Sequence, residues 1–297
     1  MQKTRKRSAY VGKVFTYGAL IFAALFSVWP IMIMALEGYA IDLSGLFSGR
    51  GIRYVSGVFS YSGGFFPTPI HYLDALRLNS FFKLMGNTLA ISAISISLAL
   101  VVGVSVAYTL ARIPIRGKGA ISYMLLALRA VSPFIVVVPL YIIYTRNGLW
   151  DTYVGVALAE ELLILSVVVW MLRGFFSDIP REIYEAAAVF GASEGQIFRR
   201  VALRMVIPGI VVTALFAFVL IWNEFVISDI LTGPAAKTVA VGVWTGLGEN
   251  TLTFKVISYD DLNAGGFLAW IPAIAVMLAI RRYLAKGYSL GTASSKS

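Results

Sequence analysis

Residues 185–193 read EAAAVFGAS and lie in the most polar internal segment of the chain, about residues 175–204. A long apolar run flanks this segment on either side. Residues 183–189 predict a short helix, and Gly191 suits the left-handed residue that commonly ends one. The local prediction is therefore a helix, a glycine turn and a second helix, placed between two apolar spans.

Capping residues support both helix starts in this segment. Asp178 and Pro180 stand where a helix start places a capping carboxylate and a proline in the first turn. Ser193 and Gln196 have the spacing of a capping box. The second helix is therefore expected to begin directly after the glycine turn.

The composition of the chain excludes a soluble domain. Of 297 residues, 59% are hydrophobic and only 13% are charged. The chain has no cysteine and one histidine, His71, so a disulfide or a His/Cys metal site is not expected. The net charge of +10 could indicate nucleic acid, but the basic residues border apolar runs, which favours a role in membrane orientation.

Apolar runs of about 20 residues predict membrane-spanning helices, because the hydrocarbon core is about 30 Å thick. The sequence therefore predicts an all-α, multi-pass protein of the cell membrane with six spans, residues 14–36, 84–111, 120–145, 152–172, 205–227 and 262–280. Arg129, Pro133 and Pro139 interrupt the third span, and the two prolines are expected to kink it.

The remaining segments complete the predicted organisation. They are an N-terminal segment (1–13), a loop (37–83) whose part 46–66 has no helical period, a core of five spans (84–280) that includes the polar segment 175–204, and a polar C-terminal tail (281–297). The predicted inner segments hold 17 Lys and Arg residues and the outer segments seven. By the positive-inside rule both termini and the segment 175–204 are expected to be cytosolic.

This polar segment resembles the glutamate-alanine-alanine loop of permease subunits from ATP-binding-cassette importers. The residues that match its pattern are Glu185, Ala186, Ala187, Gly191, Val201 and Leu203. Phe190 and Arg204 depart from the pattern, standing where such permeases commonly carry aspartate and proline. The alternative is an amphipathic cytosolic linker that happens to be rich in alanine.

The resemblance extends from about Pro67 to the end of the chain and is to the second permease of maltose-type carbohydrate importers. The matching stretches are residues 87–89, 107–112, 133, 139–141, 170–176, 222–225 and 282–287. The order of these motifs along about three-quarters of the chain is more specific than any one of them.

The resemblance implies a type I importer permease that takes up a sugar. Implied partners are two ATPase subunits, a second homologous permease and an extracytoplasmic sugar-binding protein. The ATPases, which use ATP and Mg²⁺, would dock on Glu185, Ala186, Ala187, Gly191, Ala192, Ser193 and Leu203. This chain is expected to be non-catalytic and to bind neither a cofactor nor nucleic acid, and Gly12-Lys13 and Gly117-Lys118 both lack the upstream glycine of a phosphate-binding loop.

Charged residues within spans are costly and usually face the bundle interior. Arg129 and Glu160 fall at similar depths, so an Arg129 pair with Glu160 or Glu161 is the leading hypothesis. The alternatives are the sugar path and the interface with the second permease. Asn223 and Glu224 could hydrogen-bond sugar hydroxyls or join two helices.

Other classes of function stay open at this point. A non-sugar solute is one alternative, and an ion-coupled secondary transporter is another, although no internal repeat is visible. A membrane enzyme is disfavoured because Ser105, in a near-match to a nucleophile elbow, lies mid-span without a histidine partner. A need for ATP and separate ATPase subunits would distinguish the importer from an ion-coupled transporter.

Overall fold

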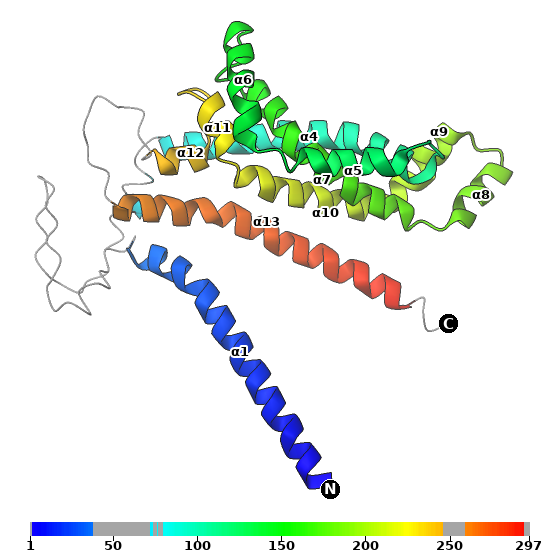
Figure 1. The fold of residues 1–297 in the computed structure, drawn as a ribbon, viewed down its shortest axis with the longest axis horizontal. Coiled ribbons are helices and arrows are strands. Elements are labelled where there is room, and N and C mark those ends of the chain that lie inside the picture. The colour runs from blue at the N-terminus through cyan, green and yellow to red at the C-terminus, as the bar shows by residue number, and fades with distance from the viewer. Residues whose placement is uncertain (1, 38–71, 74–75, 77–79, 246–258, 294–297) are drawn as a thin grey trace, which may run out of the picture. The chain divides into compact units, whose positions relative to one another are not determined.

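The computed structural model describes residues 2–37, 72–73, 76, 80–245 and 259–293, and every regular element within them is a helix (Figure 1). The helices are α1 (Gln2–Glu37), α4 (Ser80–Arg112), α5 (Lys118–Leu128), α6 (Pro133–Arg146), α7 (Tyr153–Ser177), α8 (Arg181–Val189), α9 (Glu194–Gln196), the π-helix η1 (Ile197–Ala202), α10 (Leu203–Trp222), α11 (Val226–Leu231), α12 (Val239–Trp244) and α13 (Tyr259–Ala293). The predicted all-α class is confirmed. Most of the predicted loop 37–83, including 46–66, lies outside the described residues.

Five helices of the described chain are long and apolar enough to cross a membrane, and the bent pair α5–α6 makes a sixth if it counts as one span. The five cover Thr16–Leu36, Phe81–Arg112, Tyr153–Ser177, Glu194–Trp222 and Leu262–Ala279. The helix that corresponds to the predicted span 205–227 differs most from its prediction, because it covers Glu194–Trp222. It begins at Glu194 because α9, η1 and α10 follow one another without a break.

The third span is broken rather than straight, since α5 and α6 meet at 81°. Ser132 has extended backbone and Pro133 occupies the first turn of α6, where its missing N–H leaves no helical hydrogen bond unmade. Pro139 lies inside α6 without ending it. Of the two prolines that were expected to kink this span, only Pro133 lies at a break in the helix.

The chain divides into two compact units, residues 1–81 with 246–268 and residues 82–245 with 269–297. In the first unit, the Tyr72 hydroxyl donates to the carbonyl of Ala35 in α1 at 2.9 Å. The Tyr72 ring also meets Phe267 edge to face, with centroids 6.1 Å apart. One side chain therefore links the two helices of this unit.

Small residues set the packing of the second unit. The Ser95 hydroxyl donates to the Ala157 carbonyl at 3.1 Å, which joins α4 to α7. Further along the same pair, a Cβ on Gly103 would lie 2.7 Å from Cγ1 of Val168. Because both contacts advance in the same direction, α4 and α7 run parallel and approach closely.

The predicted polar C-terminal tail (281–297) is helical over most of its length, because helix α13 continues to Ala293. Leu284, Ala285 and Lys286 are strong helix formers and extend the last span without a proline to stop it.

Candidate functional site

The coupling segment, defined here as residues 175–204, folds into the predicted helix, glycine turn and helix. Helix α8 ends at Val189, and Gly191 adopts a left-handed φ of 79°. Its backbone N–H donates to the carbonyl of Ala188 at 2.9 Å, which satisfies one of the free carbonyls at the helix end.

Capping residues behave as expected on one side of the turn only. The backbone N–H of Ser193 donates to Oε1 of Gln196 at 3.0 Å, as part of a capping box. The prediction that Asp178 caps α8 is wrong. Asp178 instead closes α7 in right-handed conformation, its N–H donating to Gly174, and the N-cap of α8 is Pro180, which has no side-chain oxygen to offer.

Helix α8 lies at one end of the second unit (Figure 1), and large apolar side chains are exposed where it ends. Val189 is 85% exposed and Phe190 is 88% exposed. Glu185 and Ala186 on the same helix are exposed as well. Exposed large apolar side chains on an otherwise polar segment are typical of a surface that binds another protein.

The other predicted docking residues divide between surface and interior. Gly191 and Ser193 are exposed, whereas Ala187, Ala192 and Leu203 are half-buried. Of these three, Ala187 and Ala192 pack against the core beneath α8.

The inner face of α8 is anchored through Tyr184, which is only 4% exposed. The guanidinium carbon of Arg112, at the end of α4, lies 3.5 Å from the centroid of the Tyr184 ring. This is well within the range of a cation–π contact. The Tyr184 hydroxyl is buried without a hydrogen-bond partner. Burial raises the pKa of this hydroxyl, and the Arg112 charge partly opposes the rise.

An aromatic cluster continues this anchor into the spans. The ring of Tyr108 on α4 lies 5.5 Å from that of Phe176 on α7 and 4.8 Å from that of Phe198 in η1. The three helices converge beneath α8, and Ile183 of α8 packs against the same core. Helix α8 therefore packs against a core that α4, α7 and η1 share, and η1 continues directly into α10.

The predicted Arg129 pair is absent from the described part of the chain. Arg129 is exposed at the break between α5 and α6. Glu160 is 1% exposed on α7, and the neighbouring carboxyl group is that of Glu224. One oxygen of Glu160 and one of Glu161 are buried without a partner. Arg129 stands at the 81° break between α5 and α6, a feature that depth along a straight span could not reveal.

Glu224 and Asn223 lie at the break that follows α10. The Glu224 carboxylate accepts hydrogen bonds from the backbone N–H groups of Ile227 at 2.9 Å and Ser228 at 3.1 Å. It therefore caps the N-terminus of α11. Asn223 is exposed, and its amide donates to the Val219 carbonyl at 2.7 Å. In this structure both residues shape the chain at the break, and their contact with a solute stays a prediction.

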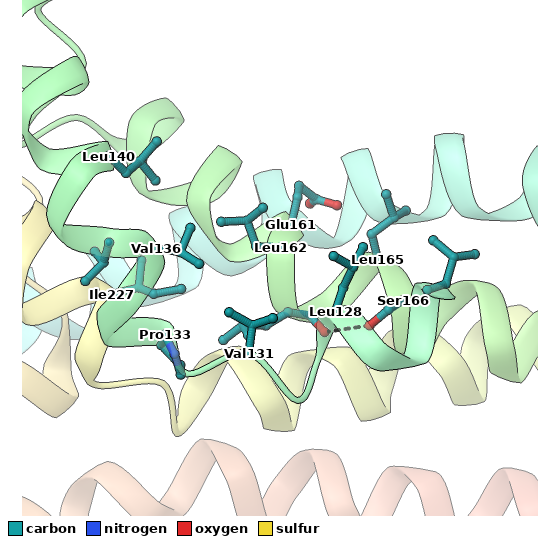
Figure 2. A pocket seen from close by; sticks show the side chains of 13 residues that line it. Leu128, Val131, Pro133, Val136, Leu140, Glu161, Leu162, Leu165, Ser166 and Ile227 are labelled. Atoms are coloured by element: carbon teal, nitrogen blue, oxygen red, sulfur yellow. Dashed lines mark hydrogen bonds between the residues drawn. The ribbon is translucent and has the colours of Figure 1, made fainter. Parts of the chain in front are cut away.

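A cavity of about 250 Å³ lies between the broken span, α7 and α11 (Figure 2). Leu128 and Pro133 line it from the two sides of the break, and Ile227 lines it from α11. Glu161 and Ser166 supply its polar groups. The residues Arg129 and Glu160 are not part of its lining, so the structure gathers Glu161 alone of the predicted in-span charges at this cavity.

No group of three or more His, Cys, Asp or Glu side chains within the described ranges could hold a metal ion.

The spans, the exposed helix α8 that is anchored to them, and the cavity at the broken span together define a membrane transport component. Residues 99–286 match the model of the binding-protein-dependent transport system inner membrane component. The chain belongs to this family.

Relatives of known name cover most of the chain. It is 29% identical over 77% of its length to the Probable ABC transporter permease protein y4oR of Sinorhizobium fredii, of which it covers 80%. It is 28% identical over 89% of its length to the trehalose transport system permease protein SugB of Mycobacterium tuberculosis, of which it covers 96%.

Solved structures share the fold. A chain of a bacterial ABC transporter involved in import of the acidic polysaccharide alginate matches with a TM-score of 0.71 at 18% identity, over 93% of this chain and 98% of that one. A chain of the MetNI methionine ABC transporter matches with a TM-score of 0.56 at 18% identity, over 69% and 95%.

Two structural features escaped the sequence analysis. Arg112 and Tyr184 are 72 positions apart, and nothing local pairs them. Asp151 ends a short loop and carries a left-handed φ of 56°, rare for a residue with a side chain. The sequence offered one signal for a special role of Asp151, which is its charge in the turn just before a span.

Proposed function

We propose that this chain is the permease subunit of an ATP-driven importer, and that its coupling segment receives the movement of separate ATPase subunits. The observation that carries the proposal is the two-sided geometry of α8. Its outer face presents Phe190 and Glu185, while Tyr184 packs its inner face onto the spans. A docked helix can move the spans only if it is anchored to them, and α8 is anchored through Tyr184.

The proposed assembly contains two ATPase subunits that use ATP and Mg²⁺, a second homologous permease and an extracytoplasmic sugar-binding protein. Both termini and the coupling segment face the cytosol in this arrangement. Support comes from the family description, which names binding-protein-dependent transport, and from relatives named as ABC transporter permeases. This chain contributes the path and the docking surface, and the ATPase subunits contribute hydrolysis.

The solute that we propose is a mono- or oligosaccharide. Relatives are named for the transport of trehalose, alpha-glucosides and diacetylchitobiose. The cavity beside the broken span offers Glu161 and Ser166 as the side chains able to hydrogen-bond a hydroxyl-rich solute.

Gly191 gives a sharp test of docking. A Cβ there meets no atom within 4 Å, so only the φ of 79° resists substitution. Asparagine tolerates this conformation, whereas a valine is strained by roughly 1–2 kcal/mol. Recovery of the chain on a tagged ATPase subunit is expected to survive Gly191→Asn and to fall at least fivefold in Gly191→Val. Equal recovery of both variants would contradict docking through α8.

Reconstituted vesicles test the energy source and the solute. Uptake of labelled trehalose and maltose is expected only when ATP and the ATPase subunits are present. Uptake driven by a proton or sodium gradient alone would contradict the importer and favour an ion-coupled transporter.

A further inference from the structure

A single carboxylate holds the loop between α11 and α12. Oδ1 of Asp151 accepts hydrogen bonds from the backbone N–H groups of Gly233 at 2.7 Å and Ala236 at 2.8 Å. Oδ2 accepts one from Ala235 at 3.0 Å. The Asp151 N–H donates to the carbonyl of Leu231 at 3.0 Å. Three hydrogen bonds thus join Asp151 to this loop and a fourth joins it to the end of α11, about 80 positions away.

The backbone at Asp151 is held in a costly conformation to make these bonds. Its φ of 56° is left-handed, and such strain persists only where surrounding contacts over-determine it. The fit is close on the loop side too, since a Cβ on Gly233 would lie 2.8 Å from both Oδ2 of Asp151 and the Trp150 ring.

Helix α4 holds the same loop from a second side. The Asn87 amide donates to the carbonyls of Ala235 at 3.0 Å and Lys237 at 2.9 Å. The backbone N–H of Val239, at the start of α12, donates to the Thr88 hydroxyl at 2.8 Å. Asn87 and Thr88 are both buried, so these bonds are shielded from competing water.

We define the cap as residues 226–245, which comprise α11, the loop and α12. Its apolar side chains Ile227 and Leu231 pack in one cluster with Val137 of α6 and with Val156 of α7. Ile227 is also a wall of the cavity beside the broken span. The cap therefore closes one side of that cavity, while side chains of α4 and of the loop before α7 tie it down.

We infer that Asp151 is the positioning residue of a latch that keeps the cap closed over the cavity, so that releasing the latch admits solvent and solute there. The non-helical break at residues 223–225 gives the cap a joint with α10, and the latch sets whether that joint opens. Naming solute rests on the proposed function, but the latch itself does not.

Two variants separate the carboxylate from the backbone strain. Asp151→Gly relieves the left-handed φ and removes the carboxylate, whereas Asp151→Asn keeps the shape and the conformation but turns an amide donor toward backbone donors. Asp229→Asn is the charge-matched control, because Asp229 is exposed on α11 and its side chain takes no part in the latch.

The chain lacks cysteine, so single cysteines report local access without background. Val137→Cys lies in the cluster with the cap, and Val168→Cys is its matched control in the cluster beneath the coupling segment; both valines are almost fully buried. The assay is the reaction rate with a small methanethiosulfonate reagent, on the full chain in membrane vesicles.

We expect Asp151→Gly to speed the reaction of Val137→Cys at least tenfold, Asp151→Asn to speed it less, and Asp229→Asn to leave it unchanged. Val168→Cys is expected to react equally slowly in every background. Equal reaction rates of Val137→Cys with and without Asp151 would overturn the latch. Equal acceleration at Val137→Cys and Val168→Cys would overturn it too, because it would indicate general unfolding. Adding ATP to the complex with the ATPase subunits tests the proposed function separately. An unchanged reaction rate of Val137→Cys on ATP addition would count against ATP-driven movement of the spans and not against the latch.

Discussion

Replacing Arg112 with glutamine is expected to loosen α8 while leaving the spans intact. The guanidinium lies 3.5 Å from the centroid of a buried ring, and glutamine keeps a polar but shorter side chain that has no charge for that ring. Tyr184→Phe provides the opposite change. It keeps the ring and removes a hydroxyl that is buried without a partner.

The size of each effect follows from the contact. A cation–π pair of this kind contributes about 1 kcal/mol, between the values for exposed and desolvated sites. Arg112→Gln should therefore raise the population of undocked α8 roughly fivefold. Tyr184→Phe should leave that population unchanged or lower it, because a buried unpaired hydroxyl costs about 1 kcal/mol or more.

Hydrogen exchange of peptides covering α8 measures this population, because exchange reports local opening. Peptides from α7 serve as the internal reference. Arg116→Gln is the matched control, since Arg116 is exposed on the loop after α4. In a double-mutant cycle, Arg112→Gln and Tyr184→Leu should couple by about 1 kcal/mol.

Two results would refute the reasoning. One is a coupling energy within about 0.3 kcal/mol of zero, which is the level expected for independent sites. The other is faster exchange in Arg116→Gln than in Arg112→Gln, which would show that the general positive charge of the loop matters and the ring contact does not.

Two further changes test the packing of the spans and the cap. Gly209→Ala places a methyl group in the Phe175 ring and should destabilise the chain by about 1–3 kcal/mol. Thermal unfolding followed by tryptophan fluorescence measures this loss, and Phe175→Leu should partly rescue it. No loss of stability would contradict the close packing of α10 on α7. Asn87→Ala removes two hydrogen bonds to the cap and the acceptor of the Tyr153 hydroxyl, so it should lower stability by about 2–3 kcal/mol. The control Ser97→Ala, on the exposed side of α4, should change stability by less than about 0.5 kcal/mol. Equal effects would contradict the hydrogen bonds by which α4 holds the cap.

The spans and the coupling segment could be predicted because their rules are local. Hydropathy over about 20 residues decides whether a helix can cross a membrane. Gly191 and the Ser193–Gln196 pair act within one turn of the backbone, and the structure places both as expected. Asp178 was misassigned because a capping residue can serve the helix before it or the helix after it, and sequence alone does not choose.

The partners of the in-span charges could not be predicted. A charge within a span shows that it needs a partner, but its partner depends on the rotation and bending of two helices. Arg129 is exposed at the 81° break, and the chain that follows α10 brings Glu224 close to Glu160 instead.

The amino-acid sequence by itself determined the number of apolar spans and the helix–glycine–helix form of the coupling segment, because hydrophobic length and capping are properties of neighbouring residues. Only the tertiary structure decided that Arg112 holds Tyr184 and that Asp151 holds the cap. Those contacts join residues 72 and 82 positions apart, and they form only once the helices have packed in their final orientation.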